Sequence, residues 1–195
     1  MHVGRSVTSV LYLASAAARL RCSPAPARRL VRMATPGLPY PRAAVSCVLA
    51  TQQEDGGQSY LLVKRGKPPG VGLWSLPGGK LELGEETLAG ALRETFEETG
   101  LDETVLTLHP WPITTTDAIY RDDEGGYAFH YCIAQVYASV LPEAVDSVVA
   151  GDDALEVRWF TLEEVQALQD DDIAGNVLSV VRISQQLKEA NIISN

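Results

Sequence analysis

The feature that most constrains this chain is the segment "ETLAGALRETFEET", residues 86–99, with Gly100 directly after it. Its apolar residues recur at the three- and four-residue intervals of an α-helix, and glycine commonly follows a helix end. The apolar residues on one side of that helix are Leu88, Leu92 and Phe96. Three glutamates share an arc of about 100° on the opposite side: Glu94, Glu97 and Glu98. We therefore predict an amphipathic helix whose apolar side, with Phe96 as an anchor, packs on a core.

The segments around this helix have the pattern of short β-strands. Apolar and β-branched residues occur in runs of strand length, separated by turns rich in glycine and proline. The predicted strands are residues 43–50, 59–65, 104–116, 127–140 and 156–162, with two shorter ones within 74–85. Two further helices are predicted at 161–168, where Thr161 and Glu164 have the spacing of a capping box, and at 172–190. This arrangement predicts a mixed α/β sandwich.

Charge is divided unevenly along the 195 residues. The first 42 residues contain seven arginines and no acidic residue, whereas the remaining 153 contain 9 lysines and arginines against 25 acidic residues. The net charge of −9 therefore conceals a body with a net charge of −16. Such a body repels the phosphate backbone of nucleic acids, so we predict no nucleic-acid partner. An anionic ligand would need a cation as intermediary.

Residues 1–32 have the composition of a targeting segment, because they are rich in arginine, serine and alanine and contain no acid. We predict a disordered mitochondrial or plastid transit peptide; a secretory signal and an untargeted tail are the alternatives. The apolar run from Val10 to Ala18 is too short to span a bilayer, so no membrane partner is predicted. Met33 offers a second start for a cytoplasmic form. Residues 33–42, with three prolines, are predicted to link this segment to a domain at 43–190.

The three cysteines exclude two other classes of protein. Cys22, Cys47 and Cys132 contain no Cys-x-x-Cys pair, and their number is odd. Neither a disulfide scaffold nor a zinc ribbon is therefore expected. Cys47 and Cys132 lie in apolar, strand-like runs, and we predict that both are small core residues.

Taken alone, the acidic side of the helix has two interpretations. Like charges at helical spacing cost only about 0.2–0.5 kcal/mol per pair, so a solvated face is tolerable. A divalent cation site is the alternative, because hard cations such as Mg²⁺ bind carboxylate oxygens. The residues before the helix favour the second interpretation. Gly78 and Gly79 form a turn in which the backbone can approach a ligand closely, and Glu85 follows at a fixed interval.

The full pattern is Gly79-x5-Glu85-x7-Arg93-Glu94-Thr95-x-Glu97-Glu98-x-Gly100-Leu101. It resembles the Nudix box, G-x5-E-x7-R-E-U-x-E-E-x-G-U, in which U is a bulky aliphatic residue. Eight of the nine defining positions match, and Thr95 is the departure, on the apolar side of the predicted helix. The resemblance extends over about residues 43–190 and implies the Nudix α/β/α sandwich with a mixed central sheet.

The resemblance also implies hydrolysis of a nucleoside diphosphate linked to another group, with water attacking phosphorus beside Mg²⁺ or Mn²⁺ ions. Metal ions reverse the local charge and let a pyrophosphate approach carboxylates. By motif position, the implied metal ligands are Glu94, Glu97, Glu98 and the carbonyl of Gly78. Arg93 is implied to orient a glutamate in catalysis, and Glu85 to brace the loop that leads into the helix.

The general base of the reaction is left open between two groups of acids. One group is the box glutamates, of which Glu94 and Glu98 are the catalytic candidates. The other is a loop acid further along the chain, in "AGDDALE", residues 150–156. That loop offers Asp152, Asp153 and Glu156. We favour Glu156 as a base or an extra metal ligand, and a solvated loop is the alternative.

Cations and aromatic side chains before the helix are candidates for substrate binding. Lys64, Arg65 and Lys67 precede a Gly/Pro loop, and we predict that they contact phosphate; a solvated strand end is the alternative. Trp74 is predicted to stack on a base, with a place in the core as the alternative. The other aromatic candidates for stacking are Tyr120, Tyr127, Phe129 and Tyr131.

Residues 63–86, "VKRGKPPGVGLWSLPGGKLELGEE", and the tail "AGDDALEVRWFTLEEV" are similar to the ADP-ribose pyrophosphatase-like subgroup of the family. The implied substrate is ADP-ribose or a related nucleoside diphosphate sugar, split into two monophosphates. A nucleoside triphosphate pyrophosphatase that removes altered nucleotides is the alternative, because the family changes substrate through loops outside the box. A non-catalytic nucleotide-binding module is a further alternative, which the intact glutamates disfavour. The sequence leaves open whether the chain forms a homodimer.

Overall fold

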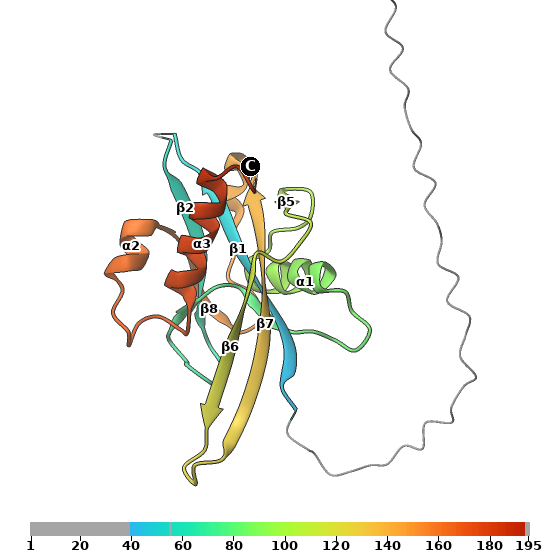
Figure 1. Ribbon diagram of the computed structural model, residues 1–195. Helices are drawn as coiled ribbons and strands as arrows, with labels where there is room; N and C mark the ends of the chain where they lie inside the picture. The colour runs from blue at the N-terminus through green and yellow to red at the C-terminus, as the bar shows by residue number, and fades with distance from the viewer. Residues whose placement is uncertain (1–39, 55, 194–195) are drawn as a thin grey trace, which may run out of the picture. The chain divides into compact units, whose positions relative to one another are not determined.

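Strand β1 (Arg42–Gln52) is the strand around which the sheet is built (Figure 1). In the computed structural model, which describes residues 40–54 and 56–193, β1 is buried on both faces. Such a strand needs a covering layer on each side of the sheet. The predicted targeting segment 1–32 lies outside the described residues, and its role stays a prediction. No helix within the described ranges has the length and apolar character needed to cross a bilayer.

The sheet is mixed, because β1 pairs in parallel with β7 while the other pairings are antiparallel. Its strands run in the order β3-β2-β1-β7-β5, with β4 paired to β1, β6 to β7 and β8 to β2. The bounds are β2 (Gln58–Arg65), β3 (Trp74–Ser75), β4 (Gly78–Lys80), β5 (Leu106–Leu108), β6 (Thr114–Arg121), β7 (Tyr127–Val140) and β8 (Ala154–Thr161).

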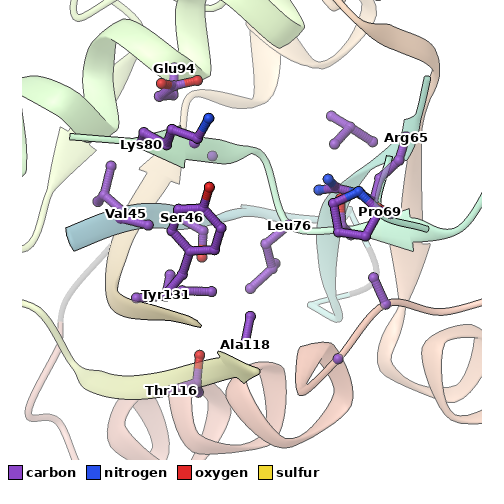
Figure 2. Close-up of a pocket in the computed structure, with 18 of the residues that line it drawn as sticks. Val45, Ser46, Arg65, Pro69, Leu76, Lys80, Glu94, Thr116, Ala118 and Tyr131 are labelled. Atoms are coloured by element: carbon purple, nitrogen blue, oxygen red, sulfur yellow. The ribbon is translucent and has the colours of Figure 1, made fainter. Parts of the chain in front are cut away.

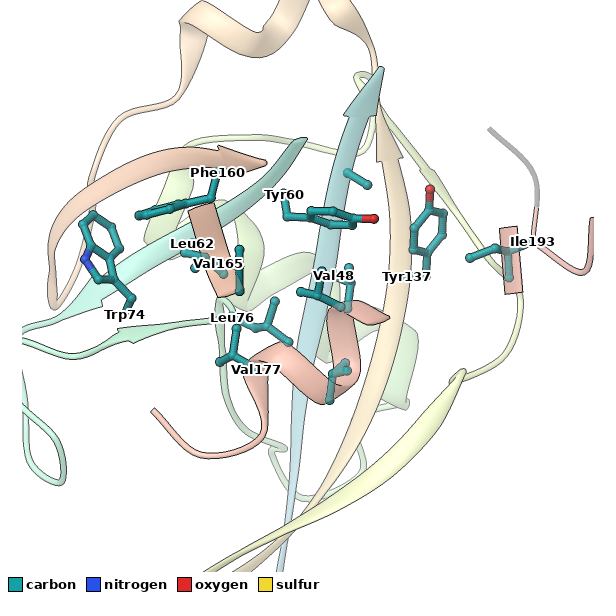
Figure 3. Packing of buried hydrophobic residues seen from close by; sticks show 13 residues of the cluster. Val48, Tyr60, Leu62, Trp74, Leu76, Tyr137, Phe160, Val165, Val177 and Ile193 are labelled. Carbon is teal, nitrogen blue, oxygen red and sulfur yellow. The ribbon is translucent and has the colours of Figure 1, made fainter. Parts of the chain in front are cut away.

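Hydrophobic cores lie on both faces of the sheet. On one face, Val48 of β1 packs with residues of α2 (Leu162–Ala167) and α3 (Val177–Glu189), as Figure 3 shows. On the other face, Val45 and Leu49 of β1 pack with Ala91 of α1 (Thr87–Thr99) and with the short 3-10 helix η1 (Pro142–Ser147). The predicted α/β/α sandwich with a mixed central sheet is confirmed.

Helix α1 ends as predicted but buries a different side. Gly100 follows it in the left-handed conformation, with a φ of 73°, and its amide donates to the carbonyl of Phe96. Phe96 itself is 56% exposed, so the prediction that it anchors the helix to the core is wrong. The buried side instead includes Ala91, Thr95 and Glu98. Because small residues let this side approach the sheet, the acidic arc borders the buried side rather than facing away from it.

Several predicted boundaries also differ from the structure. The single strand predicted at 104–116 is interrupted between β5 and β6, where Pro110 and Pro112 cannot donate to a ladder. Strand β6 then continues to Arg121, beyond the predicted end. Helix α3 begins at Val177, five residues after the predicted start. The predicted capping box at the start of α2 is present, with both hydrogen bonds formed.

The two described cysteines have different environments. Cys47 is buried as predicted, and burial raises the pKa of its thiol to about 12. Cys132 is exposed and lies opposite Asp117 in the β6–β7 ladder, so the prediction that it is a core residue is wrong. The ends of β6 and β7 extend away from the helices (Figure 1). Alternation along a strand does not reveal which part lies beyond the helices.

Gly78 and Gly79, predicted to form a turn, are the first two residues of strand β4, where they bring groups closer together than a side chain would allow. Gly78 has a φ of 155°, and a Cβ there would collide with the carbonyl oxygen of Val45. At Gly79, a Cβ would lie 2.5 Å from the carboxylate of Glu94. Glycine at both positions therefore lets α1 and β1 lie close to β4.

We expect Gly78→Ala to lower the free energy of unfolding by about 2–5 kcal/mol, because backbone strain and overpacking act together. Gly84→Ala is the matched control, since its φ is 90° but no atom lies within 4 Å of the added Cβ. We expect the control to lose only about 1 kcal/mol. Urea unfolding followed by circular dichroism measures both, and equal losses would contradict a close approach at Gly78.

Candidate functional site

A cavity of about 850 Å³ opens on the face of the sheet that carries α3. Its walls are β4, the acidic side of α1, the β6–β7 hairpin, the start of α3 and the loops that follow β2 and precede β8. Figure 2 shows Glu94, Lys80 and Tyr131 following one another across one part of the cavity, with Arg65 and Pro69 in another. A cavity of this size fits a nucleotide-sized molecule.

Arg93 holds the acids of this wall together. Its Nε and Nη2 donate to the two carboxylate oxygens of Glu85 at 2.8 and 3.0 Å, a bidentate pair. Nη1 donates to Glu94 at 2.7 Å and to Glu97 at 3.2 Å. The Arg93 guanidinium lowers the pKa of Glu85 to about 2. This placement agrees with an orienting role for Arg93 and a bracing role for Glu85.

Glu98 is buried without a cationic partner among the described residues. Its Oε2 accepts a hydrogen bond from the amide of Gly78 at 3.0 Å. The pKa of Glu98 is raised to about 8, mainly by burial; the charges of Asp153 and Glu94 add to the shift, and the hydrogen bond from Gly78 and the charge of Arg65 oppose it. Burial also raises the pKa of Glu94, although Arg93 opposes the shift. Without a nearby cation, Glu98 therefore favours its protonated form up to about pH 8.

The donor set of this wall fits a divalent cation. Its groups are carboxylate oxygens, which Mg²⁺ and Mn²⁺ prefer, and a nearby cation would favour the charged form of Glu98. Glu94, Glu98 and Gly78 line the cavity. No three acidic, histidine or cysteine side chains in the described part of the chain already form a metal cluster. Ligation by Glu94 and Glu97 would therefore compete with their contacts to Arg93.

The acidic loop before β8 brings Asp153, rather than Glu156, to the cavity. The amide of Gly151 donates to the carbonyl of Glu98 at 3.1 Å, which ties this loop to the end of α1. Asp152 and Asp153 line the cavity, and the charge of Asp153 reaches Glu98. Glu156 does not line it. The preference for Glu156 as the base does not fit this placement.

Two of the predicted phosphate contacts lie at the cavity and two predicted substrate contacts do not. Arg65 and Lys67 line it, although Lys67 already pairs with Asp152 at 3.5 Å and with Asp153 at 3.4 Å. Lys64 lies elsewhere, because its ammonium pairs with Glu156 at 3.7 Å and stands 5.5 Å from the centre of the Trp74 ring.

Trp74 belongs to the core rather than to the cavity wall. It is only 8% exposed, and its ring packs edge-on against Phe160 with 4.8 Å between the ring centres. The core alternative stated for this residue is therefore the one that the structure supports. The sequence around Trp74, next to a Gly/Pro loop, does not distinguish a place in the core from a place in the cavity wall.

The floor of the cavity contains a polar chain that the sequence did not reveal. The hydroxyl of Ser46 donates to Oε1 of Gln135, and Nε2 of Gln135 donates to the hydroxyl of Thr116 at 2.8 Å. Lys80 also lines the cavity and was not predicted as a contact. These residues meet only when β1, β4, β6 and β7 pair, so no local motif marks them.

Comparison with known proteins identifies the family by sequence. The model of the NUDIX domain matches residues 40–180. An ADP-ribose pyrophosphatase of Methanocaldococcus jannaschii is 34% identical over 111 residues, which is 57% of this chain and 59% of that protein. A nucleoside triphosphate pyrophosphatase/Nudix hydrolase fusion protein of Bifidobacterium longum is 30% identical over 95 residues, 48% of this chain and 17% of that protein. The match thus covers less than two thirds of either relative.

Solved structures share the fold at lower identity. An Ap4A hydrolase binary complex of C. elegans has a TM-score of 0.61 at 21% identity, covering 76% of this chain and 98% of that one. The NUDIX domain of Shewanella oneidensis NrtR, crystallised with ADP ribose, has a TM-score of 0.59 at 22% identity, covering 75% and 88%. At these identities the likeness concerns the fold alone.

We expect the metal-free protein to lose stability as the pH rises from about 4.5 to about 8. Over this range the folded protein keeps a proton on Glu98, because its pKa is raised to about 8, while the unfolded chain releases it. Glu98→Gln cannot lose that proton. In EDTA at about pH 8, the variant should therefore be more stable than the wild type, by a few kcal/mol.

Urea unfolding at several pH values measures this difference, with Glu143→Gln, an exposed glutamate on η1, as the matched control. Adding Mg²⁺ should stabilise the wild type more than Glu98→Gln. Equal stability of the wild type and Glu98→Gln at the higher pH in EDTA would show that the buried Glu98 carboxylate does not lower the free energy of unfolding.

Proposed function

The chain belongs to the NUDIX domain family, and from this premise we propose that it is a pyrophosphohydrolase. Its proposed substrate is ADP-ribose or a related nucleoside diphosphate sugar, which it splits into two monophosphates with Mg²⁺ or Mn²⁺. The single observation that carries the proposal is the buried carboxylate of Glu98, beside Glu94, at the wall of a nucleotide-sized cavity. A pyrophosphate cannot approach these acids unless their charge is reversed.

A divalent cation, when bound, supplies that reversal and lowers the pKa of a water molecule bound to it. Glu94, Glu97 and Glu98, with the carbonyl of Gly78, are the residues that we propose to hold it. Arg93 keeps Glu94 and Glu97 in place before substrate arrives. Arg65, at the same cavity, is our candidate for contact with the substrate phosphates. We propose that Asp153 accepts the proton of the attacking water, because its charge already reaches Glu98.

The choice of ADP-ribose is supported by the archaeal relative at 34% identity, which is described as an ADP-ribose pyrophosphatase. A cavity of about 850 Å³ has room for a molecule with groups on both sides of a pyrophosphate. The alternative, a nucleoside triphosphate pyrophosphatase, uses the same acids and differs in what the rest of the cavity binds. We retain the proposal that the acidic body excludes nucleic acid.

We expect the purified chain with Mg²⁺ to convert ADP-ribose into AMP and ribose 5-phosphate, and to release no pyrophosphate from nucleoside triphosphates. Glu98→Gln should lower kcat by about 10²–10⁴-fold, because it removes a carboxylate that we propose holds the cation beside the reacting atoms. The matched control Glu143→Gln should keep the wild-type rate. Chromatographic product analysis measures each reaction. Pyrophosphate from triphosphates without AMP from ADP-ribose would establish the alternative, and full activity of Glu98→Gln would remove the assigned site.

A second comparison decides between the two loop acids. We expect Asp153→Asn to lower kcat by about 10²-fold or more, as removal of a general base does, and Glu156→Gln to change it less than about threefold. Both variants exchange a carboxylate for its amide, so they serve as controls for each other. Rates at saturating ADP-ribose measure the difference. The opposite ranking would restore Glu156 as the base.

A further inference from the structure

One face of the β6–β7 hairpin lines the cavity, and the acidic residues of α1 line another part of it. Alternate residues along each strand point to the same side of a sheet. The register pairs Thr116 with Ile133, Ala118 with Tyr131 and Tyr120 with Phe129, and all of these residues line the cavity. We refer to this side of the hairpin as the inner face.

Three aromatic rings follow one another on the inner face. The ring centres of Tyr120 and Phe129 are 4.6 Å apart, and those of Phe129 and Tyr131 are 5.8 Å apart. We name these three residues the aromatic row. None of them belongs to either hydrophobic core, and Tyr120 is 38% exposed. The row therefore does not contribute to core packing, and it presents aromatic surface to whatever the cavity holds.

Lys80 connects the aromatic row to the acidic wall. Its Nζ lies 5.9 Å from the centre of the Tyr131 ring, and the residue before it, Gly79, contacts the carboxylate of Glu94. Figure 2 shows Lys80 between Glu94 and Tyr131. Within the described residues Lys80 forms no ion pair, unlike Lys64 and Lys67. Its ammonium is thus available to an anionic ligand.

We propose that the nucleoside half of the substrate lies on the inner face, with its base stacked on the aromatic row and its phosphate beside Lys80. This rests on the proposed function only in taking the ligand to be a nucleotide. Stacking suits any base, because every base has a π-face, so the row sets affinity for the nucleoside half more than its identity.

The test measures the affinity of the full chain with Mg²⁺ for two probes, AMP and ribose 5-phosphate, by calorimetry. Tyr131→Leu should weaken AMP binding about tenfold and leave ribose 5-phosphate unchanged, because only AMP carries a base. Tyr131→Phe keeps the ring and should bind AMP like the wild type. Tyr127→Leu is the matched control, since Tyr127 is on the same hairpin, 57% exposed and outside the cavity lining.

Lys80→Gln should weaken AMP binding several-fold, and the loss should shrink at high salt, which screens an exposed charge.

Should Tyr131→Leu fail to fold, Tyr120→Leu at the more exposed end of the row gives the same test. AMP binding that depends on the row, in a protein that does not hydrolyse ADP-ribose, would keep this inference and discard the proposed function. Hydrolysis of ADP-ribose with unchanged AMP affinity in Tyr131→Leu, or no AMP binding by the wild type, would overturn the inference.

Discussion

The close approach of helix α1 to strand β4 is the constraint on which the rest of the site depends. Gly78 and Gly79 have no side chains to separate the two elements, so Glu94 lies against Gly79. Glu98 accepts a hydrogen bond from the amide of Gly78 at 3.0 Å. The same approach removes Glu98 from water and raises its pKa to about 8. Without a cation, the charged form of a carboxylate buried in this way destabilises the protein. A nearby cation stabilises that charged form. The glycines and the glutamates therefore form one structural unit.

Arg93 stabilises this wall without neutralising its most buried acid. One guanidinium binds Glu85 in the loop before α1 and Glu94 and Glu97 on α1, which fixes the loop and the helix to each other. None of its described contacts reaches Glu98. Such an arrangement fixes the positions of Glu94 and Glu97, whereas Glu98 forms no ion pair among the described residues.

Local sequence patterns predicted which segments form helices and strands, whereas tertiary contacts determine which side of each element is buried. The helix that ends before Gly100 and the capping box of Thr161 are visible in the sequence because their periods and hydrogen bonds span only a few residues. Phe96 was placed in the core because a helical wheel assumes that the apolar side packs, whereas the glycines of β4 let the side of Thr95 and Glu98 approach the sheet. The acids of the site were predictable from their spacing. Lys80 was not, because its neighbour Tyr131 is 51 positions away and belongs to another strand.

The two parts of the cavity are carried by opposite layers of the sandwich. Helix α1 packs on the face of the sheet that includes Val45, whereas the inner face of the hairpin continues the face that includes Val48 and α3. They meet at strand β4, where Lys80 follows Gly79. A substitution in the aromatic row can therefore change how tightly a ligand is held while leaving the packing of α1 undisturbed. This separation gives a physical reason why one acidic helix can act on many substrates within a single fold.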